Sequence, residues 1–259
     1  SGPQHRRSRD LLVLAAAVCH ATWNLCVKRI NGGAELVWLF SIISCVLYLP
    51  ATIYIIVTVQ PHFGWLEFGF VVGSSLLHLG YFLLLQAGYR KGDLSLVYPT
   101  ARATGPLLSV SFAVLFLGEY ITLQIAAGAA LIIFGVISLT GGFGKRSSNL
   151  SSSLAFGIGS GTFIGAYTVW DAHAVAILLV PPLVLDLASI LCRMTILTPV
   201  AIKRFDLVKS HWNNYRWEVM IIAIFSPLAY ILVLYALTFT PVVYIAPLRE
   251  SSVLITVLL

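Results

Sequence analysis

The chain has 259 residues, of which 59% are hydrophobic and 10% are charged, and its mean hydropathy is +0.92. Soluble domains carry about a quarter of their residues as charges, and a single core could not bury so large an apolar excess. This composition excludes a soluble globular domain and predicts a polytopic membrane protein. The net charge of +6 lies mostly in short segments between apolar runs, where it sets membrane topology, so we expect no nucleic-acid partner.

Nine continuously apolar runs follow a polar tail at residues 1–10, and each is near the ~20 residues that a membrane-spanning helix needs. The predicted helices are 11–27, 36–59, 68–89, 94–117, 121–139, 154–170, 181–202, 219–238 and 242–259. No small-residue cleavage site follows the first run, so we do not expect a signal peptide. Because no run shows the alternation of a membrane strand, the sequence predicts an all-α polytopic membrane protein.

Two segments in the third and eighth runs resemble each other. LGYFLLLQA at 79–87 and LAYILVLYA at 228–236 agree at five of nine positions, and Pro99 and Pro247 then correspond in the fourth and ninth runs. Because five helices are an odd number, a second copy of such a unit is inverted in the membrane. We therefore expect two inverted five-helix repeats, with a tenth helix in addition to the nine visible here. The expected division of the chain is 11–140, a polar connection at 141–153, and 154–259.

The charged connections favour one orientation in the membrane. All of the loop lysines and arginines lie in odd-numbered connections: Lys28, Arg29, Arg90, Lys91, Lys145, Arg146, Lys203, Arg204, Lys209 and Arg216. Since cytoplasmic loops are enriched in Lys and Arg, this distribution places the odd connections in the cytoplasm and the N-terminus outside. The glycosylation sequon at Asn149 would favour the opposite orientation, but it is a short pattern.

Charged residues inside the predicted helices are the first candidates for a functional site: Arg102, Asp186, Arg193, Arg249 and Glu250. Each would cost roughly 2.5–3.5 kcal/mol at the centre of a lipid-facing helix, so we expect them to face the interior, to pair or to line water. Arg102 and Glu250 correspond under the repeat and lie ~12 Å into their helices. They are expected to bind a substrate or a proton, or else to form a structural ion pair. Asp186 and Arg193 share one helix face and are expected to bridge neighbouring helices or to take part in coupling.

Polar aromatic residues form a second group of candidates. His78 and Tyr81 share one face of the third helix, and Tyr230 corresponds to Tyr81 under the repeat. Tyrosines offer an apolar ring and a hydroxyl, so they suit the lining of an amphipathic cavity. Trp170 lies at a predicted helix end, where we expect an interfacial anchor. The predicted substrate-binding set is Trp23, Asn24, His78, Tyr81, Tyr98, Arg102, Tyr167, Tyr230, Arg249 and Glu250.

Four regions of the chain resemble EamA-type members of the drug/metabolite transporter superfamily. They are HATWNLCVKR at 20–29, YRKGDLSLVYPTARATGPLLSVSFAVLFLGE at 89–119, GAYTVWDAHAV at 165–175, and SPLAYILVLYAL with PVVYIAPLRESSVL within 226–254. The resemblance implies ten helices in two inverted repeats, a central substrate cavity and the export of small metabolites. The second LGE-like stretch and the tenth helix of the family pattern are absent. The family's cytoplasmic N-terminus is also opposite to the orientation that the charges favour.

The sequence contains no GK[ST] phosphate loop, HExxH or GxSxG motif, so we expect a passive or gradient-driven transporter and not an enzyme. The cysteines lack zinc-site spacing, and we expect neither a metal nor a cofactor. The predicted function is the export of small polar or amphipathic metabolites, amino acids first, through a midplane cavity by alternating access in a bacterial inner membrane. Its expected partners are membrane lipids and a small-molecule substrate, and a homo-oligomer or membrane complex stays open. The alternatives are a flippase of lipid-linked groups and a non-transporting subunit of a larger complex.

Overall fold

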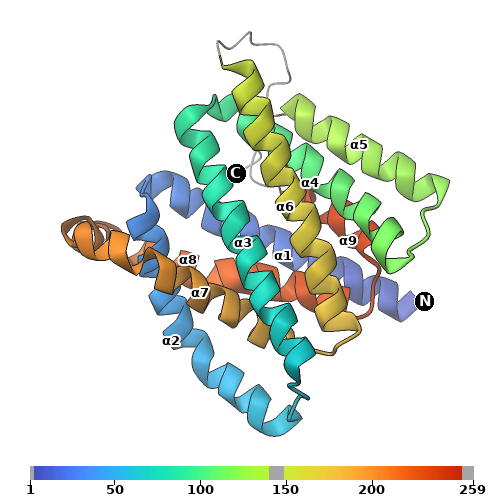
Figure 1. Cartoon of the computed structure of the whole chain (residues 1–259), viewed down its shortest axis with the longest axis horizontal. Helices are drawn as coiled ribbons and strands as arrows, with labels where there is room; N and C mark the ends of the chain where they lie inside the picture. Colours follow the sequence, from blue (N-terminus) through green and yellow to red (C-terminus); the bar gives the residue numbers. More distant parts are fainter. Residues whose placement is uncertain (1–2, 140–148, 253–259) are drawn as a thin grey trace.

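A computed structural model describes residues 3–139 and 149–252, and within these residues the chain forms nine α-helices and no strand. The all-α prediction is thereby confirmed (Figure 1). The helices are α1 (Pro3–Ile30), α2 (Ala34–Val59), α3 (Trp65–Lys91), α4 (Leu94–Leu117), α5 (Leu123–Leu139), α6 (Leu150–Ala176), α7 (Pro182–Lys203), α8 (Phe205–Leu237) and α9 (Val242–Arg249). The end of the ninth predicted run, at 253–259, and the lysine and arginine at 145 and 146 lie outside the described residues.

Six of these helices are long and apolar enough to cross a membrane: α1, α2, α3, α4, α7 and α8. The outer surface of these helices carries many exposed apolar side chains and therefore requires contact with lipid. On α2, for example, Val46, Tyr54 and Val57 are all at least 65% exposed. Large apolar side chains exposed in this number along a helix are stable only against lipid or another apolar surface. The chain is therefore an integral, multi-pass membrane protein.

Three helices, α1, α6 and α8, extend furthest beyond the runs that the sequence predicts. α1 begins at Pro3, so most of the polar tail is the first part of a helix. α6 continues past Trp170 to Ala176 and includes Asp171 and His173, whose polar side chains had interrupted the apolar run. α8 begins at Phe205 and has non-helical backbone angles at Tyr215 (φ −136°, ψ 30°), which separate an exposed first third from the apolar remainder.

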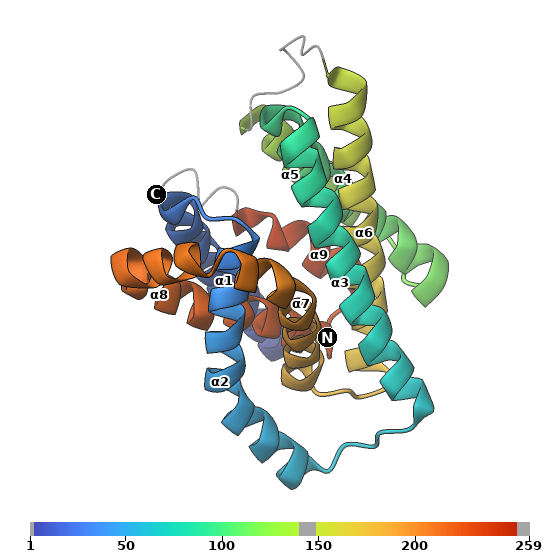
Figure 2. The same cartoon turned by 60° about the vertical axis from the view of Figure 1, so that its left-hand side comes forward.

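Small residues bring α4 and α6 into close contact (Figures 1 and 2). Gly157, Gly161 and Gly165 form a stripe at four-residue spacing on α6. A Cβ atom added at Gly157 or Gly161 would lie 2.6 Å from the Cβ of Thr100 or Thr104 on α4, which is far inside van der Waals contact. Small residues at this spacing let two membrane helices pack backbone against backbone. The α4–α6 contact thus joins the first half of the chain to the second.

Several of the helix pairs that pack together recur when the two halves of the chain are exchanged. α1 packs on α8, and the corresponding pair α6 and α3 also pack together; the same holds for α2 with α8 and for α7 with α3. Exchanging the halves replaces α2 by α7 and α7 by α2, so the packed pair α2 and α7 stays the same pair. Two copies of one five-helix unit would produce this pattern.

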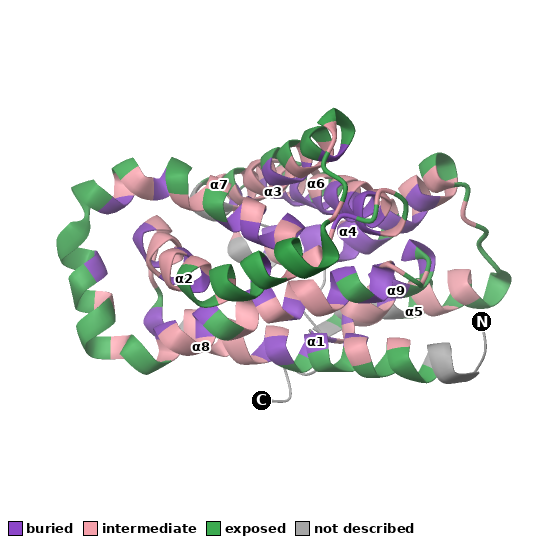
Figure 3. Cartoon of the chain, turned by 90° about the horizontal axis from the view of Figure 1, so that it is seen from below, coloured by how far each residue is buried: buried purple, intermediate pink, exposed green. Residues whose placement is uncertain are grey.

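Buried residues concentrate where α4, α6, α8 and α9 meet, while the first third of α8 and the outer face of α1 are mostly exposed (Figure 3). The core cluster is apolar and includes Val175 on α6, Leu234 on α8 and Ile245 on α9. Pro99, Pro106 and Pro247 are buried within this region. A proline frees a backbone carbonyl, which is tolerated at this depth only beside protein or water. The core therefore surrounds the positions where charged side chains enter the interior.

Candidate functional site

A buried carboxylate forms one end of the polar cluster inside the bundle. Asp171 on α6 has no exposed surface. Its Oδ2 atom lies 2.9 Å from His78 Nε2 on α3 and also accepts a hydrogen bond from the Tyr230 hydroxyl on α8. The other carboxylate oxygen, Oδ1, is buried and has no hydrogen-bond partner within the described residues. An unfilled acceptor on a buried carboxylate is costly and indicates a place where a ligand, a water or a proton can bind.

Aromatic rings from two helices, α3 and α8, surround Tyr167, which lies one helical turn before Asp171. The imidazole of His78 stacks on the Tyr167 ring with 4.0 Å between centroids. Tyr81 and Tyr230 approach the same ring edge-on, with centroids at 5.8 and 6.2 Å. Tyr81 and Tyr230, which the sequence comparison pairs, therefore both contact the Tyr167 ring. The rings provide a flat, weakly polar wall with hydroxyl groups at its edges.

A second pair of charges lies on α4 and at the end of α9. Arg102 Nε is 3.0 Å from Glu250 Oε2, and both side chains are at least 90% buried. These two atoms are within ion-pair distance but lack the alignment of a hydrogen bond. Arg102 Nη2 also donates to the Ser252 hydroxyl at 3.2 Å, and its guanidinium carbon lies 6.0 Å from the centre of the Tyr98 ring. The pair thus connects the two halves of the chain inside the protein.

The structure brings most of the predicted residues into this region. His78, Tyr81, Tyr167, Tyr230 and Arg249 are in contact with one another, and Tyr98, Arg102 and Glu250 form the adjacent ion-pair group. No contact within the described residues links Asn24 to them. Nor are Asp186 and Arg193 part of the group: Arg193 packs over the Phe40 ring of α2, at 5.9 Å.

Asp171 is the functional candidate that the sequence prediction missed. The sixth run was taken to end at Trp170, so Asp171 counted as a loop residue. The sequence feature that could have identified it is the segment VWDAHAV, in which Asp171 and His173 are flanked by apolar residues on both sides. The expectation for Trp170 is also wrong: its indole donates to the Phe70 carbonyl at 2.8 Å and stacks on the Phe70 ring at 4.3 Å. Trp170 therefore packs between α3 and α6 instead of anchoring a helix end.

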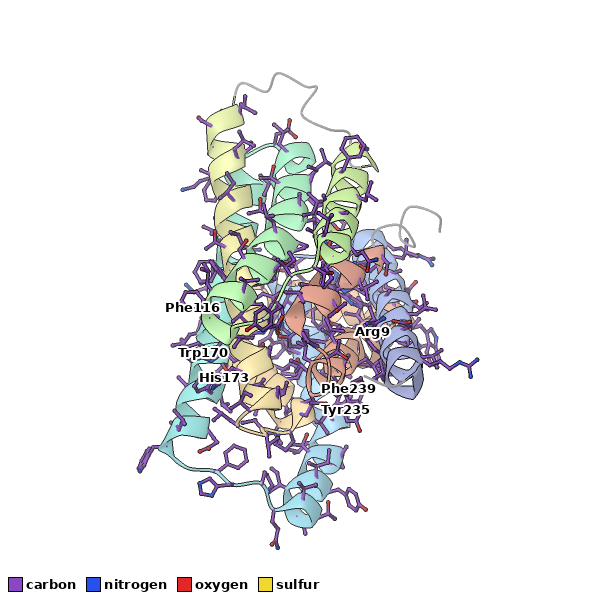
Figure 4. The ribbon with its side chains drawn as sticks, turned by 90° about the vertical axis from the view of Figure 1, so that its right-hand side faces the viewer. Arg9, Phe116, Trp170, His173, Tyr235 and Phe239 are labelled. Atoms are coloured by element: carbon purple, nitrogen blue, oxygen red, sulfur yellow. The ribbon has the colours of Figure 1, made fainter. Side chains whose placement is uncertain are left out.

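A cavity of about 500 Å³ lies at the end of the bundle where α4, α6 and α8 finish and α9 begins. Ala172, the residue after Asp171, lines it together with His173, Phe116 and Phe239 (Figure 4). Glu119, a second residue that the prediction left in a loop, borders this cavity. Its two carboxylate oxygens accept the backbone N–H groups of Val242 and Val243 at 2.8 and 2.9 Å. Glu119 thus caps the first turn of α9, where a negative charge is favoured.

The cluster combines carboxylate, guanidinium and aromatic groups. Among the described residues, no three His, Cys, Asp or Glu side chains are placed to hold one metal ion. What the interior offers is one carboxylate with an open oxygen, two guanidinium groups and several aromatic rings. Charged groups that meet inside a membrane bundle mark the path of a substrate or an ion by default.

Apolar helices on the outside and a charged, aromatic cluster within define a polytopic membrane protein of the transporter class. The family model of the EamA-like transporters matches residues 7–141, so the chain belongs to the EamA-like transporter family. A curated but uncharacterized protein of Methanocaldococcus jannaschii is 35% identical over 99 residues, which cover 38% of this chain and 68% of that protein. A solved crystal structure superposes with a TM-score of 0.77 at 16% identity, covering 97% of this chain and 86% of the other, and shows the same fold.

Proposed function

We propose that this protein is a secondary transporter that exports small polar or amphipathic metabolites, amino acids first, across a bacterial inner membrane. The observation that carries this proposal is the convergence of Asp171, His78, Tyr167, Tyr230 and Arg249 at one point inside the bundle. These residues come from α3, α6, α8 and α9, so both halves of the chain contribute to the site. A site shared between two repeats is the arrangement that alternating access requires.

The contacts between the halves suggest how access alternates. Glu119 from the α4–α5 connection holds the start of α9, and Arg102 on α4 pairs with Glu250 at its end. A substrate that enters the site perturbs these charges. It can shift the equilibrium between two arrangements of the halves only by the difference between its binding free energies for the two. We propose that the Glu119 cap closes one side of the protein and is released when that side opens.

The coupling role that the sequence suggested for Glu250 fits Asp171 better. Glu250 is 2% exposed and already paired with Arg102, whereas Asp171 retains an unfilled oxygen beside His78. In this proposal Asp171 accepts either the ammonium group of a substrate or a coupling proton. When a proton or a cation binds a buried carboxylate, its charge is neutralised, and this change couples an ion gradient to a conformational change.

Counterflow in proteoliposomes tests the proposed function. Purified protein is reconstituted with a high internal concentration of one unlabelled amino acid, and the entry of the same labelled compound is followed for a panel of amino acids. Transient accumulation of at least one label above that in protein-free vesicles is expected. The Asp171→Asn variant should lose it, and a variant at the exposed Lys209, Lys209→Gln, should keep it. If no label accumulates across amino acids, nucleosides and sugars, the transport proposal is wrong.

A further inference from the structure

Two cations of the membrane helices, Arg193 and Arg249, have no carboxylate within ion-pair distance among the described residues, and Arg249 is the one that lies at the candidate site. Arg102 is paired with Glu250 at 3.0 Å, and Asp171 is engaged by His78 and Tyr230. Arg249 has no carboxylate within ion-pair distance and no hydrogen bond in the part of the chain that the structure describes. An unpaired guanidinium at this depth is unfavourable unless a ligand supplies the opposite charge.

The ring beneath Arg249 leaves its donors available. The guanidinium carbon lies 6.0 Å from the centre of the Tyr167 ring, and His78 stacks on that same ring. Contact with a ring stabilises the positive charge but offers no oxygen to the N–H groups of the guanidinium. Arg249 is half-buried, so part of its side chain is accessible. The residue thus presents a forked set of donors beside an aromatic wall.

A second unpaired donor comes from α1. The indole Nε1 of Trp23 is buried and has no acceptor within the described residues. His20, one turn earlier, packs edge-on against Trp23 at 4.9 Å and lies within electrostatic range of both Arg102 and Arg249. Indole and guanidinium groups donate hydrogen bonds and do not accept them. Trp23 and Arg249 therefore each present donors that no acceptor among the described residues fills, and the oxygens of a bound anion would fill them.

We propose that Arg249 binds a carboxylate group of the transported substrate, while the Arg102–Glu250 pair remains internal. This inference rests on the proposed function and narrows it to substrates that carry a carboxylate on a body able to pack against tyrosine rings. A carboxylate matches the forked geometry of a guanidinium with two parallel hydrogen bonds. One unmatched cation balances one negative charge, so a monoanion fits better than a phosphate dianion.

Matched pairs of small molecules test this inference. The melting temperature of the purified protein is measured against increasing phenylacetate, phenylacetamide and phenyl phosphate, and against hexanoate and hexanamide. We expect each carboxylate to stabilise the protein with a half-saturating concentration about tenfold lower than its amide, because a charge-assisted hydrogen bond is lost in the amide. Phenyl phosphate is expected to be weaker than phenylacetate.

Two variants separate Arg249 from the other arginine. Arg249→Gln should abolish the difference between carboxylate and amide. The double variant Arg102→Gln/Glu250→Gln removes a cation and an anion together, leaves the net charge unchanged and should keep the difference. The inference is overturned if wild type does not distinguish carboxylates from amides, if phenyl phosphate is the tighter ligand, or if Arg249→Gln still prefers carboxylates. None of these results removes the transport proposal, because counterflow of an uncharged or cationic compound would still establish it.

Discussion

Arg102 and Glu250 lie 3.0 Å apart inside the protein, on α4 and just after α9. The cation comes from the first half of the chain and the anion from the second, and they neutralise each other. Breaking such a pair by removing one member costs more than removing both, because the remaining charge stays buried without a partner.

For this pair we therefore expect strong coupling between substitutions. Arg102→Gln and Glu250→Gln should each lower the free energy of unfolding by about 3–5 kcal/mol, and the double variant by clearly less than either single one. Thermal unfolding of the purified proteins in one detergent measures the cycle. Additive effects of the two substitutions would mean that the contact contributes nothing to stability.

Asp171→Asn is expected to reduce transport while the protein still inserts and purifies. The substitution keeps the size of the side chain but removes the charge that accepts from His78 and Tyr230, and hydrogen bonds to charged groups are worth about 1.5–3 kcal/mol. Initial counterflow rates should fall roughly ten- to a hundredfold. Asp186→Asn, at the other buried aspartate, is the control and should retain more activity; equal losses would argue against a special role for Asp171.

Glu119→Ala should destabilise the start of α9. The alanine leaves the Val242 and Val243 N–H groups without their acceptors, and loss of a helix cap costs about 1–2 kcal/mol. A lower melting temperature in detergent is the expected result, with Glu119→Gln in between because its amide oxygen can still accept one bond. Hydrogen exchange at the first turn of α9 should speed up in both variants, and unchanged exchange would show that the cap is not formed in solution.

Gly161→Leu should prevent correct packing of α4 on α6. A Cβ at this position would lie 2.6 Å from the Cβ of Thr104, so the two backbones must separate. Size-exclusion chromatography should show aggregate in place of a single peak. Gly128→Leu on α5 is the matched control, since nothing lies within 4 Å of a Cβ added there. Similar behaviour of the two variants would contradict the close α4–α6 contact.

The orientation in the membrane stays a prediction from the loop charges. A cysteine placed at Ser210, in the exposed first third of α8, belongs to a connection rich in Lys and Arg. An impermeant thiol reagent on intact cells should fail to label it beyond the background of the unmodified chain, and labelling should appear after permeabilisation. Efficient labelling of intact cells would place the odd-numbered connections outside.

Local sequence determined which segments become helices and which charges enter the interior. The predicted fourth helix, 94–117, matches α4 at both ends, because a continuous apolar run in a membrane must satisfy its backbone internally. The same argument placed Arg102 and Glu250 at similar depth and excluded lipid as their partner. Hydropathy is a property of neighbouring residues, so it can be read without the fold.

Only the tertiary structure determined which side chains from distant parts of the sequence contact each other. Asp171 was assigned to a loop because its charge ended an apolar run, yet His78 and Tyr230 make it a buried residue within α6. Glu119 likewise gains its role only because α9 begins beside it. Arg249 and Arg102 are equivalent in hydropathy, and only the arrangement of helices shows that Glu250 pairs with Arg102. Since a charge inside a membrane is stabilised by whatever lies next to it in space, the sequence could name the candidates but not assign their roles.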